Sequence, residues 1–207
     1  MVAAPDDALR QFRHDVRSPL NVVLGFAVML EEDLDGDDAE SARHIRVAAE
    51  QILGLVEALP GEAAPAATFG ASRPNRAAPV DGDVVLIEDN ASNVRLVERI
   101  LAHRPTVTLT SLTDVDEVRG WLAASTAAPA VVLLDRHLGR ADGLDLVGEI
   151  RSVHDDVPIV VVTADATDLA RDEARSAGAD AVVTKPFSVA ELLEVVDQSS
   201  SATGSKR

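Results

Sequence analysis

The sequence contains no cysteine and no tyrosine, and a single tryptophan among its 207 residues. The absence of cysteine excludes disulfide bonds and thiolate metal sites. Basic residues are also scarce, because 19 Lys and Arg stand against 35 Asp and Glu, which gives a formal net charge of −16. A surface that binds nucleic acid needs clustered Lys and Arg to displace counterions. The charge therefore argues against a nucleic-acid partner.

Long hydrophobic runs are missing as well. The longest apolar run, residues 22–30, is about half as long as a membrane-spanning helix. The N-terminal segment is charged from Asp6 onward, so we expect no secretory signal peptide. These features predict a cytoplasmic protein without a membrane partner. The hydrophobic content of 46% is nevertheless sufficient for a core, which must be mainly aliphatic.

A change in composition divides the chain. Residues 60–81 hold four of the ten prolines and show no periodic apolar pattern, which predicts a flexible linker. The expected organisation is a first domain over 1–59, a second over 82–198, and a disordered tail over 199–207.

The first domain carries two apolar stripes with helical spacing. Their members recur every three or four residues, first in Leu9, Phe12, Val16, Leu20, Val23, Ala27, Leu30 and Leu34, then in Ile45, Ala48, Ile52, Leu55 and Leu59. A Gly-Asp-Asp break at 36–38 separates them, so the pattern predicts a helical hairpin. In a lone hairpin, the apolar stripes stay exposed to solvent. We therefore expect a homodimer that closes a four-helix bundle.

His14 lies on the first predicted helix, roughly 200° around the helix axis from both Phe12 and Val16, and so away from the stripe. Asp15 beside it can accept a proton from the imidazole, the usual way to make a histidine nucleophilic. Pro19 removes a backbone donor, and we expect a kink just past the histidine. These residues alone fit either a nucleophile or an ordinary surface histidine.

The stretch HDVRSPLN at 14–21, followed by LGF at 24–26, resembles the phosphoacceptor box of the histidine-kinase dimerisation domain. The resemblance covers about residues 8–59. It implies that His14 accepts a phosphoryl group on the flank of a dimeric bundle, supported by Asp15 and Ser18. Phosphatase-competent members often have Thr or Asn where this chain has Ser18, which leaves phosphatase activity open.

The second domain alternates strand and helix patterns five times. The β-branched runs lie at 84–87, 106–112, 130–134, 159–162 and 181–183, with helical stretches near 92–103, 114–124, 143–153, 167–177 and 189–197. This alternation predicts an α/β fold with a doubly wound, five-stranded parallel sheet. Only the second run alternates in hydropathy, which favours an edge strand.

Polar residues follow the strands at the edge where such sheets bind ligands. Three carboxylates, Glu88, Asp89 and Asp135, converge there and need a cation, and oxygen ligands without His or Cys favour Mg²⁺. Thr163 and Lys185 end two further strands and can neutralise phosphate oxygens. Ordinary solvent-exposed loop residues do not account well for five such side chains at the ends of the strands.

The stretches VVLIEDNASN, VVLLDRHLGRADGLDLVGEIR, IVVVTAD and AGADAVVTKPF resemble the receiver domain of response regulators, a flavodoxin-like fold. The resemblance implies that Asp135 is the phosphoacceptor and that Glu88 and Asp89 bind Mg²⁺ together with the backbone carbonyl of His137. It further implies that Thr163 and Lys185 bind the phosphoryl oxygens and that the Lys185–Pro186 bond is cis.

Two positions depart from the receiver pattern. Gly139 stands where the loop commonly has Pro, and Val182 replaces the aromatic residue whose side chain often reports the switch. The aromatic flip is therefore absent, and we expect coupling through Thr163 and the backbone.

Two phosphoacceptors in one chain predict a phosphorelay protein. Phosphoryl groups would pass between His14, Asp135 and external histidine kinases, receivers or phosphotransfer proteins. No two glycines are spaced i, i+2, and no Walker-type loop is present, so we expect no ATP site and no autonomous kinase activity. The alternative is a stand-alone regulator in which Asp135 controls hairpin pairing or partner binding and His14 is vestigial. A haloacid-dehalogenase-like phosphatase fits poorly, because it needs an aspartate where His137 stands.

Overall fold

The computed structural model describes residues 5–59, 79–124 and 127–204. The chain forms two compact units: a helical hairpin at the N-terminal end, and an α/β unit made by most of residues 70–207. Most of the predicted linker, 60–78, lies outside the described residues. Among those that are described, no helix is both long enough and apolar enough to cross a bilayer.

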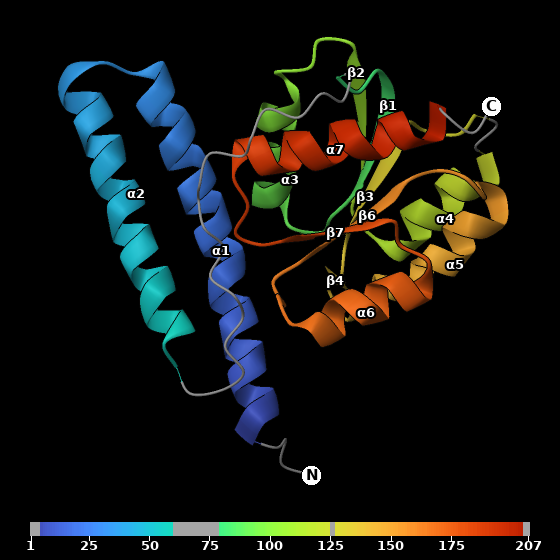
Figure 1. Ribbon diagram of the computed structural model, residues 1–207, viewed down its shortest axis with the longest axis horizontal. Helices are drawn as coiled ribbons and strands as arrows, with labels where there is room; N and C mark the ends of the chain where they lie inside the picture. The colour runs from blue at the N-terminus through green and yellow to red at the C-terminus, as the bar shows by residue number, and fades with distance from the viewer. Residues whose placement is uncertain (1–4, 60–78, 125–126, 205–207) are drawn as a thin grey trace. The chain divides into compact units, whose positions relative to one another are not determined.

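The hairpin consists of α1 (Pro5–Asp33) and α2 (Gly36–Glu57), as Figure 1 shows. Pro19 lies inside α1, which continues past it to Asp33. Across the hairpin, the Glu31 carboxylate accepts hydrogen bonds from Arg43 Nε at 2.7 Å and Arg46 Nε at 2.9 Å. At the other end of the hairpin, Arg13 donates to the carbonyl of Leu59 at 2.6 Å. Polar contacts therefore tie the two helices together near both ends.

The apolar interior of the hairpin contains only part of the apolar stripe. Its buried cluster consists of Leu20, Leu24, Ala49 and Leu53, with Val16 packed against it. Much of the predicted stripe is instead exposed, by 37% to 71%: Phe12, Val23, Leu30, Leu34, Ile45, Ile52 and Leu55. The physical reason is that one neighbouring helix covers only one side of an apolar stripe.

The α/β unit contains a five-stranded sheet in the order β2-β1-β3-β6-β7. Its strands are β1 (Gly82–Ile87), β2 (Val107–Leu112), β3 (Val131–Asp135), β6 (Ile159–Thr163) and β7 (Ala181–Thr184). Strand β1 pairs in parallel with β2 and β3, and β3 pairs in parallel with β6. The predicted doubly wound sheet and the edge position of the second strand are confirmed.

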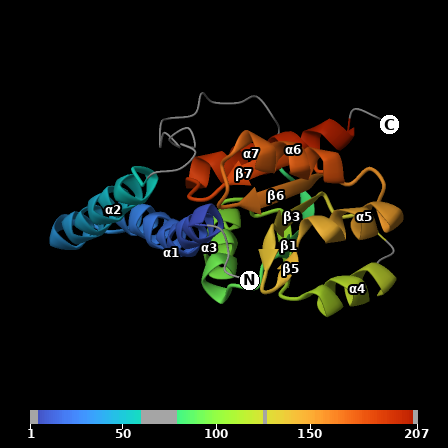
Figure 2. The ribbon, with the colours of Figure 1, turned by 90° about the horizontal axis from the view of Figure 1, so that it is seen from below.

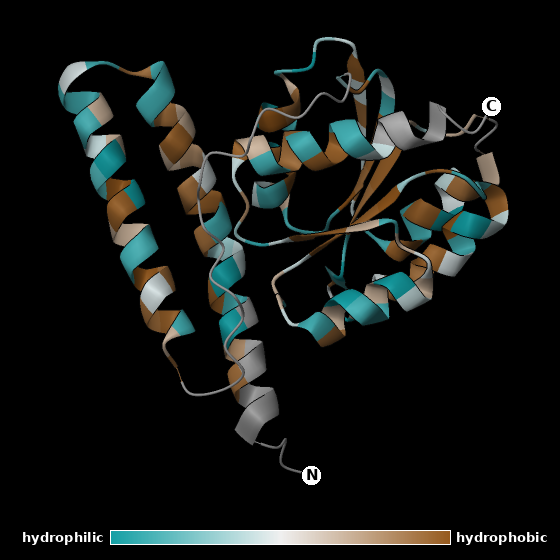
Figure 3. Cartoon of the chain, in the orientation of Figure 1, coloured by the Kyte–Doolittle hydropathy of each residue, from teal (hydrophilic) through white to brown (hydrophobic). Residues whose placement is uncertain are grey.

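Helices cover both faces of this sheet, as Figure 1 and Figure 2 show. Helices α3 (Ala91–Leu101) and α7 (Val189–Gly204) contact each other on one face. The other face carries α4 (Val115–Ala124), α5 (Leu144–Val153) and α6 (Asp168–Ala177). The central parts of β1, β3 and β6 are hydrophobic and brown in Figure 3, because strands covered on both faces bury both sets of side chains.

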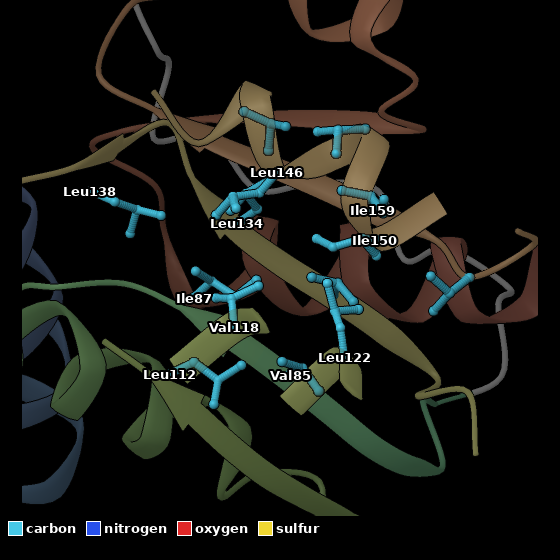
Figure 4. Close-up of a cluster of buried hydrophobic side chains, with 14 of the residues drawn as sticks. Val85, Ile87, Leu112, Val118, Leu122, Leu134, Leu138, Leu146, Ile150 and Ile159 are labelled. Atoms are coloured by element: carbon cyan, nitrogen blue, oxygen red, sulfur yellow. The ribbon is translucent and has the colours of Figure 1, made fainter. Parts of the chain in front are cut away.

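One apolar cluster fills the space between the sheet and the helices α4 and α5 (Figure 4). Alternate residues of β1, β3 and β6 contribute to it, among them Val85, Ile87, Leu134 and Ile159. Ile150 of α5 packs into the same cluster with no exposed surface. The α/β unit therefore closes its own core and fixes the strand ends that carry the polar residues.

The two ends of the α/β unit are more ordered than the composition predicts. Val80, assigned above to the linker, is fully buried, and its N–H donates to Asp197 Oδ1 at 2.8 Å. Arg104 donates to the other oxygen of Asp197 at 2.6 Å. Helix α7 runs to Gly204, so residues 199–204 are helical rather than disordered, because each added residue gains one backbone hydrogen bond once the helix has begun. Residues 205–207 lie outside the described part.

Candidate functional site

Three carboxylates meet at one edge of the sheet. Glu88 and Asp89 directly follow β1, and Asp135 ends β3, the strand that pairs with β1. One oxygen atom from each of the three lies within 4.8 Å of the other two. Glu88 and Asp135 are buried, whereas Asp89 is exposed. The cluster expected from strand ends alone is therefore present.

The donor set fits a small divalent cation. It offers carboxylate oxygens and no nitrogen or sulfur ligand, the chemistry that Mg²⁺ and Ca²⁺ prefer over zinc. At this separation, two carboxylates repel each other by roughly 3 kcal/mol at an effective dielectric constant near 20. A cation among them converts this repulsion into attraction.

Each carboxylate is also held by a backbone N–H. Asn90 N–H donates to Glu88 Oε1 at 3.1 Å, Gly139 N–H to Asp89 Oδ2 at 2.7 Å, and His137 N–H to Asp135 Oδ1 at 3.2 Å. A hydrogen bond to the charged form of a carboxylate favours that form. These donors orient the three side chains and offset part of their mutual repulsion.

A small hairpin that follows β3 supplies two of these donors. It consists of β4 (His137–Leu138) and β5 (Ala141–Asp142), paired antiparallel. Strands of two residues produce no readable alternation, and the sequence reasoning missed them. The carbonyl of His137, predicted to be a metal ligand, belongs to this hairpin, and the His137 side chain is exposed.

Gly143 closes the same loop, and the sequence reasoning assigned it no role. Its N–H donates to the carbonyl of Arg136 at 2.6 Å. A Cβ atom at this position would lie 2.1 Å from the carbonyl oxygen of Asp135, a distance that only glycine avoids. Nothing in the local sequence reveals this close approach, because the contact is made across the loop.

Asn90 is a second residue that the sequence reasoning missed, although a signal was present. It precedes α3, and its Oδ1 accepts from the N–H groups of Ser92 at 2.9 Å and Asn93 at 3.4 Å. An Asn directly before a helical pattern is a recognised N-cap signal. This cap fixes the turn that carries Glu88 and Asp89.

The two remaining receiver candidates lie at the ends of the next strands. Thr163 is the last residue of β6, whose Val162 pairs with Asp135, and it is 1% exposed. Lys185 directly follows β7 and is also 1% exposed. The predicted cis bond between Lys185 and Pro186 is present. A buried ammonium requires negative partners, which suits a site for phosphoryl oxygens.

The candidate residues of the hairpin lie together on α1. His14 belongs to this helix, but its side chain lies outside the described part of the structure. Asp15 is exposed and Ser18 is half-buried. The predicted outward orientation of the imidazole therefore stays a prediction.

Comparison with known families gives two matches. Residues 84–197, more than half of the chain, match the response regulator receiver domain. Residues 6–59 match the His Kinase A (phospho-acceptor) domain. Both families are parts of two-component signalling, and neither match is to an ATP-binding domain.

The similar curated proteins are regulators. A transcriptional regulatory protein, QseB, of Haemophilus influenzae is 42% identical over 72 residues, which are 34% of this chain and 33% of that protein. A response regulator, MprA, of a Mycobacterium species is 43% identical over 65 residues, 31% of this chain and 28% of that protein. The chain thus spans about a third or less of the length of these relatives.

Solved structures share the fold of the α/β unit. The receiver domain of a sensor histidine kinase from Pseudomonas aeruginosa, which has a magnesium ion coordinated in its active-site cleft, is 27% identical with a TM-score of 0.51. The similarity covers 58% of this chain and 98% of that one. A response regulator from Burkholderia pseudomallei with a phosphorylated aspartic acid is 25% identical with a TM-score of 0.52, over 61% of this chain and 72% of that one. The chain therefore belongs to the response regulator receiver family, with a His Kinase A (phospho-acceptor) hairpin preceding its receiver domain.

Proposed function

We propose that this protein is a phosphorelay component in which Asp135 and His14 are the two phosphoacceptors. Phosphoryl groups pass between these two residues and external histidine kinases, receivers or phosphotransfer proteins. The observation that carries this proposal is the cluster of Glu88, Asp89 and Asp135, held within 4.8 Å at the ends of β1 and β3. A phosphorylated aspartate is known in the similar Burkholderia regulator, which supports the role of Asp135.

In the proposed transfer, an oxygen of Asp135 attacks the phosphorus of a phosphohistidine. The new O–P bond forms as the N–P bond breaks, and the imidazole nitrogen keeps the electron pair. Glu88, Asp89, Asp135 and the carbonyl of His137 would hold Mg²⁺, which would supply positive charge to neutralise the phosphoryl oxygens. The Asp135 carboxylate is oriented for this step by the His137 N–H.

Thr163 and Lys185 bind the remaining phosphoryl oxygens in this proposal. The hydroxyl donates one hydrogen bond, and the ammonium offsets charge that the transferred group spreads over its equatorial oxygens. Both side chains are buried, so their interaction with an anion is weakened little by solvent. Lys185→Ala is therefore expected to slow phosphoryl transfer strongly. Its effect on the stability of the sheet is expected to be small.

His14 exchanges its phosphoryl group from the flank of the hairpin. Asp15 next to it orients the imidazole and accepts its proton when the nitrogen attacks a donor. Ser18, one turn further along α1, keeps a hydroxyl close to the same flank and supports the exchange. Magnesium-dependent loss of label from phosphorylated His14 distinguishes this role from a vestigial one.

The hairpin is proposed to pair with a second copy of this chain. Exposed members of the stripe lie on both helices, among them Phe12 and Val23 on α1 and Ile52 on α2, and both helices carry several hydrophobic segments in Figure 3. On α1, Phe12, Val23, Leu30 and Leu34 fall within about 40° of one another around the helix axis. A contiguous apolar strip of this kind on a hairpin marks an association surface.

The receiver half of the proposal is tested by labelling the protein with acetyl phosphate. Label is expected on Asp135 only when Mg²⁺ is added, and Asp135→Asn abolishes it. Asp145→Asn, which changes an exposed acid on α5, serves as the matched control and keeps the label. Labelling of Asp135→Asn at the level of the unsubstituted protein contradicts the proposal, and labelling of His14 by ATP alone contradicts the expectation of no ATP site.

A further inference from the structure

Gly139 occupies the first position of the two-residue turn between β4 and β5. Its φ is +61°, and none of the described non-glycine residues, Arg140 included, has a positive φ. A positive φ at the first of two turn residues, with a negative φ at the second, occurs in hairpin turns in which Gly, Asn and Asp dominate the positive-φ position. Proline is locked near −65° and cannot adopt the φ of Gly139.

The same residue donates a hydrogen bond to a carboxylate of the site. Gly139 N–H lies 2.7 Å from Asp89 Oδ2, a short bond for an N–H donor. Asp89 is the exposed member of the three carboxylates, so burial does not hold its side chain as it holds Glu88 and Asp135. Without the Gly139 donor, repulsion from the two buried carboxylates favours rotamers that point Asp89 into solvent.

The donor itself is held firmly. The β4–β5 pair is fixed in register by His137 opposite Asp142 and Leu138 opposite Ala141. At the end of the β4–β5 pair away from the turn, the Gly143 N–H donates to the Arg136 carbonyl. There, Asp142 Oδ1 also accepts a hydrogen bond from the N–H of Leu144 at 3.0 Å. The turn is thus anchored on both sides, and the Gly139 N–H presents a constant position to Asp89.

From these contacts we infer that Gly139 is a positioning residue that orients Asp89 for binding of a divalent cation. The inference rests on the proposed magnesium site and adds a residue to it. Groups that hydrogen-bond to a metal ligand typically change metal affinity by about tenfold or more when they are replaced. Gly139 acts through its backbone. A substitution should therefore be tolerated if the new residue can adopt the same φ and keeps the backbone N–H.

The test measures Mg²⁺ affinity of the full chain by titration calorimetry. Gly139→Pro removes the donor and excludes the observed φ, and it is expected to weaken Mg²⁺ binding about tenfold. Gly139→Asn keeps the N–H and tolerates positive φ better than other residues, so its affinity is expected to stay within about threefold of the unsubstituted protein. Arg140→Ala, at the next turn position, is the matched control and leaves the affinity unchanged.

A double-substitution cycle separates positioning from simple damage to the loop. In an Asp89→Ala background, Gly139→Pro is expected to cost at most about twofold in Mg²⁺ affinity, because the group it orients is gone. An equal loss in both backgrounds overturns the inference. Unchanged affinity in Gly139→Pro also overturns it, while leaving the proposed function intact. Absence of Mg²⁺ binding in the unsubstituted protein contradicts the proposed function itself.

A second measurement covers the case in which Gly139→Pro does not fold. Amide hydrogen exchange of Gly139 is followed without metal in the unsubstituted protein and in Asp89→Ala, which leaves the turn untouched. The inference predicts faster exchange at Gly139 in Asp89→Ala and no change at Gly143, whose N–H bonds to a backbone carbonyl. Equal exchange at Gly139 in the two proteins overturns it.

Discussion

The two units of this chain differ in how far their large hydrophobic side chains are exposed to solvent. In the α/β unit, Leu133, Ile150 and Ile159 have no exposed surface. In the hairpin, Ile52 is 47% exposed and Leu55 is 71% exposed. A sheet covered on both faces completes its own core, whereas two helices in contact cover only one side of each other.

The difference predicts which unit gains stability from a partner. The α/β unit needs none to bury its apolar surface, so its stability should not change with protein concentration. The hairpin should gain stability when a second copy covers its stripe. Each prediction below changes one side of this contrast.

The largest effect is expected from charging the exposed stripe. Val23→Asp with Ile52→Asp removes four apolar side chains from a two-fold interface, at about 1.5 kcal/mol each, and so weakens association by roughly four orders of magnitude. Light scattering over a concentration series is expected to show a dimer for the unsubstituted protein and a monomer for the variant. Val47→Asp, which charges an exposed valine on another face of α2, serves as the control and stays dimeric. A monomeric unsubstituted protein at micromolar concentration contradicts the dimer.

Truncating the closed core gives the next largest effect. Ile150→Ala leaves a cavity in the cluster beside β3 and is expected to destabilise the α/β unit by about 2–5 kcal/mol. The loss, measured by denaturant unfolding, should be the same at low and high protein concentration. Val153→Ala at an exposed position of the same helix is expected to change stability by less than about 0.5 kcal/mol. A concentration-dependent loss in Ile150→Ala means that this core, too, is completed by a partner.

A smaller change in stability, together with a loss of phosphate labelling, is expected from a substitution at Gly143, which follows β5. Gly143→Ala forces a methyl group against the Asp135 carbonyl and is expected to cost about 1–3 kcal/mol. Because the backbone of Asp135 must shift, acetyl phosphate labelling should fall strongly as well.

The control for this change is Gly148→Ala in α5, where a Cβ meets no atom within 4 Å. It is expected to stabilise the helix by up to about 1 kcal/mol and to leave labelling intact. Normal labelling in Gly143→Ala shows that the close approach does not position Asp135.

The smallest effect comes from the ion pairs of the hairpin. The hydrogen bond from Arg43, and then that from Arg46, lowers the pKa of Glu31 below its ordinary value of 4.5. Because the folded pKa is the lower one, the stabilisation is present above pH 4.5 and is lost as the pH falls through the folded value. The difference in unfolding midpoint between Glu31→Gln and the unsubstituted protein should therefore shrink in acid. A difference that stays constant from pH 7 to strong acid shows that the charge of Glu31 is not involved.

Much of the architecture follows from local patterns that the sequence displays directly. Continuous β-branched runs predicted the buried strands, and the order of strands and helices predicted the sheet. The ends of β1 and β3 predicted the cluster of Glu88, Asp89 and Asp135, because parallel neighbours end at the same edge. These features depend on residues close together in the chain, or on one general rule of topology.

Other features depend on distances across the fold and could not be predicted. The need for glycine at 143 arises from the Asp135 carbonyl, and the role of Gly139 arises from Asp89, fifty positions earlier in the sequence. The residues that fill the interior of the hairpin could not be predicted for a related reason. The stripe identifies an apolar face, but which side of it meets the neighbouring helix depends on how the two helices pack.

Transfer of a phosphoryl group between the two proposed acceptors, His14 and Asp135, tests the central claim most directly. The donor is the full chain carrying Asp135→Asn, phosphorylated on His14 by a partner kinase or a small phosphodonor. The acceptor is the full chain carrying His14→Gln, whose Asp135 is intact. On mixing with Mg²⁺, label is expected to leave His14 rapidly and to require Asp135 of the acceptor chain, with no loss when Mg²⁺ is chelated. Label that stays on His14 in the presence of an acceptor that acetyl phosphate can phosphorylate contradicts exchange between the two residues of this protein.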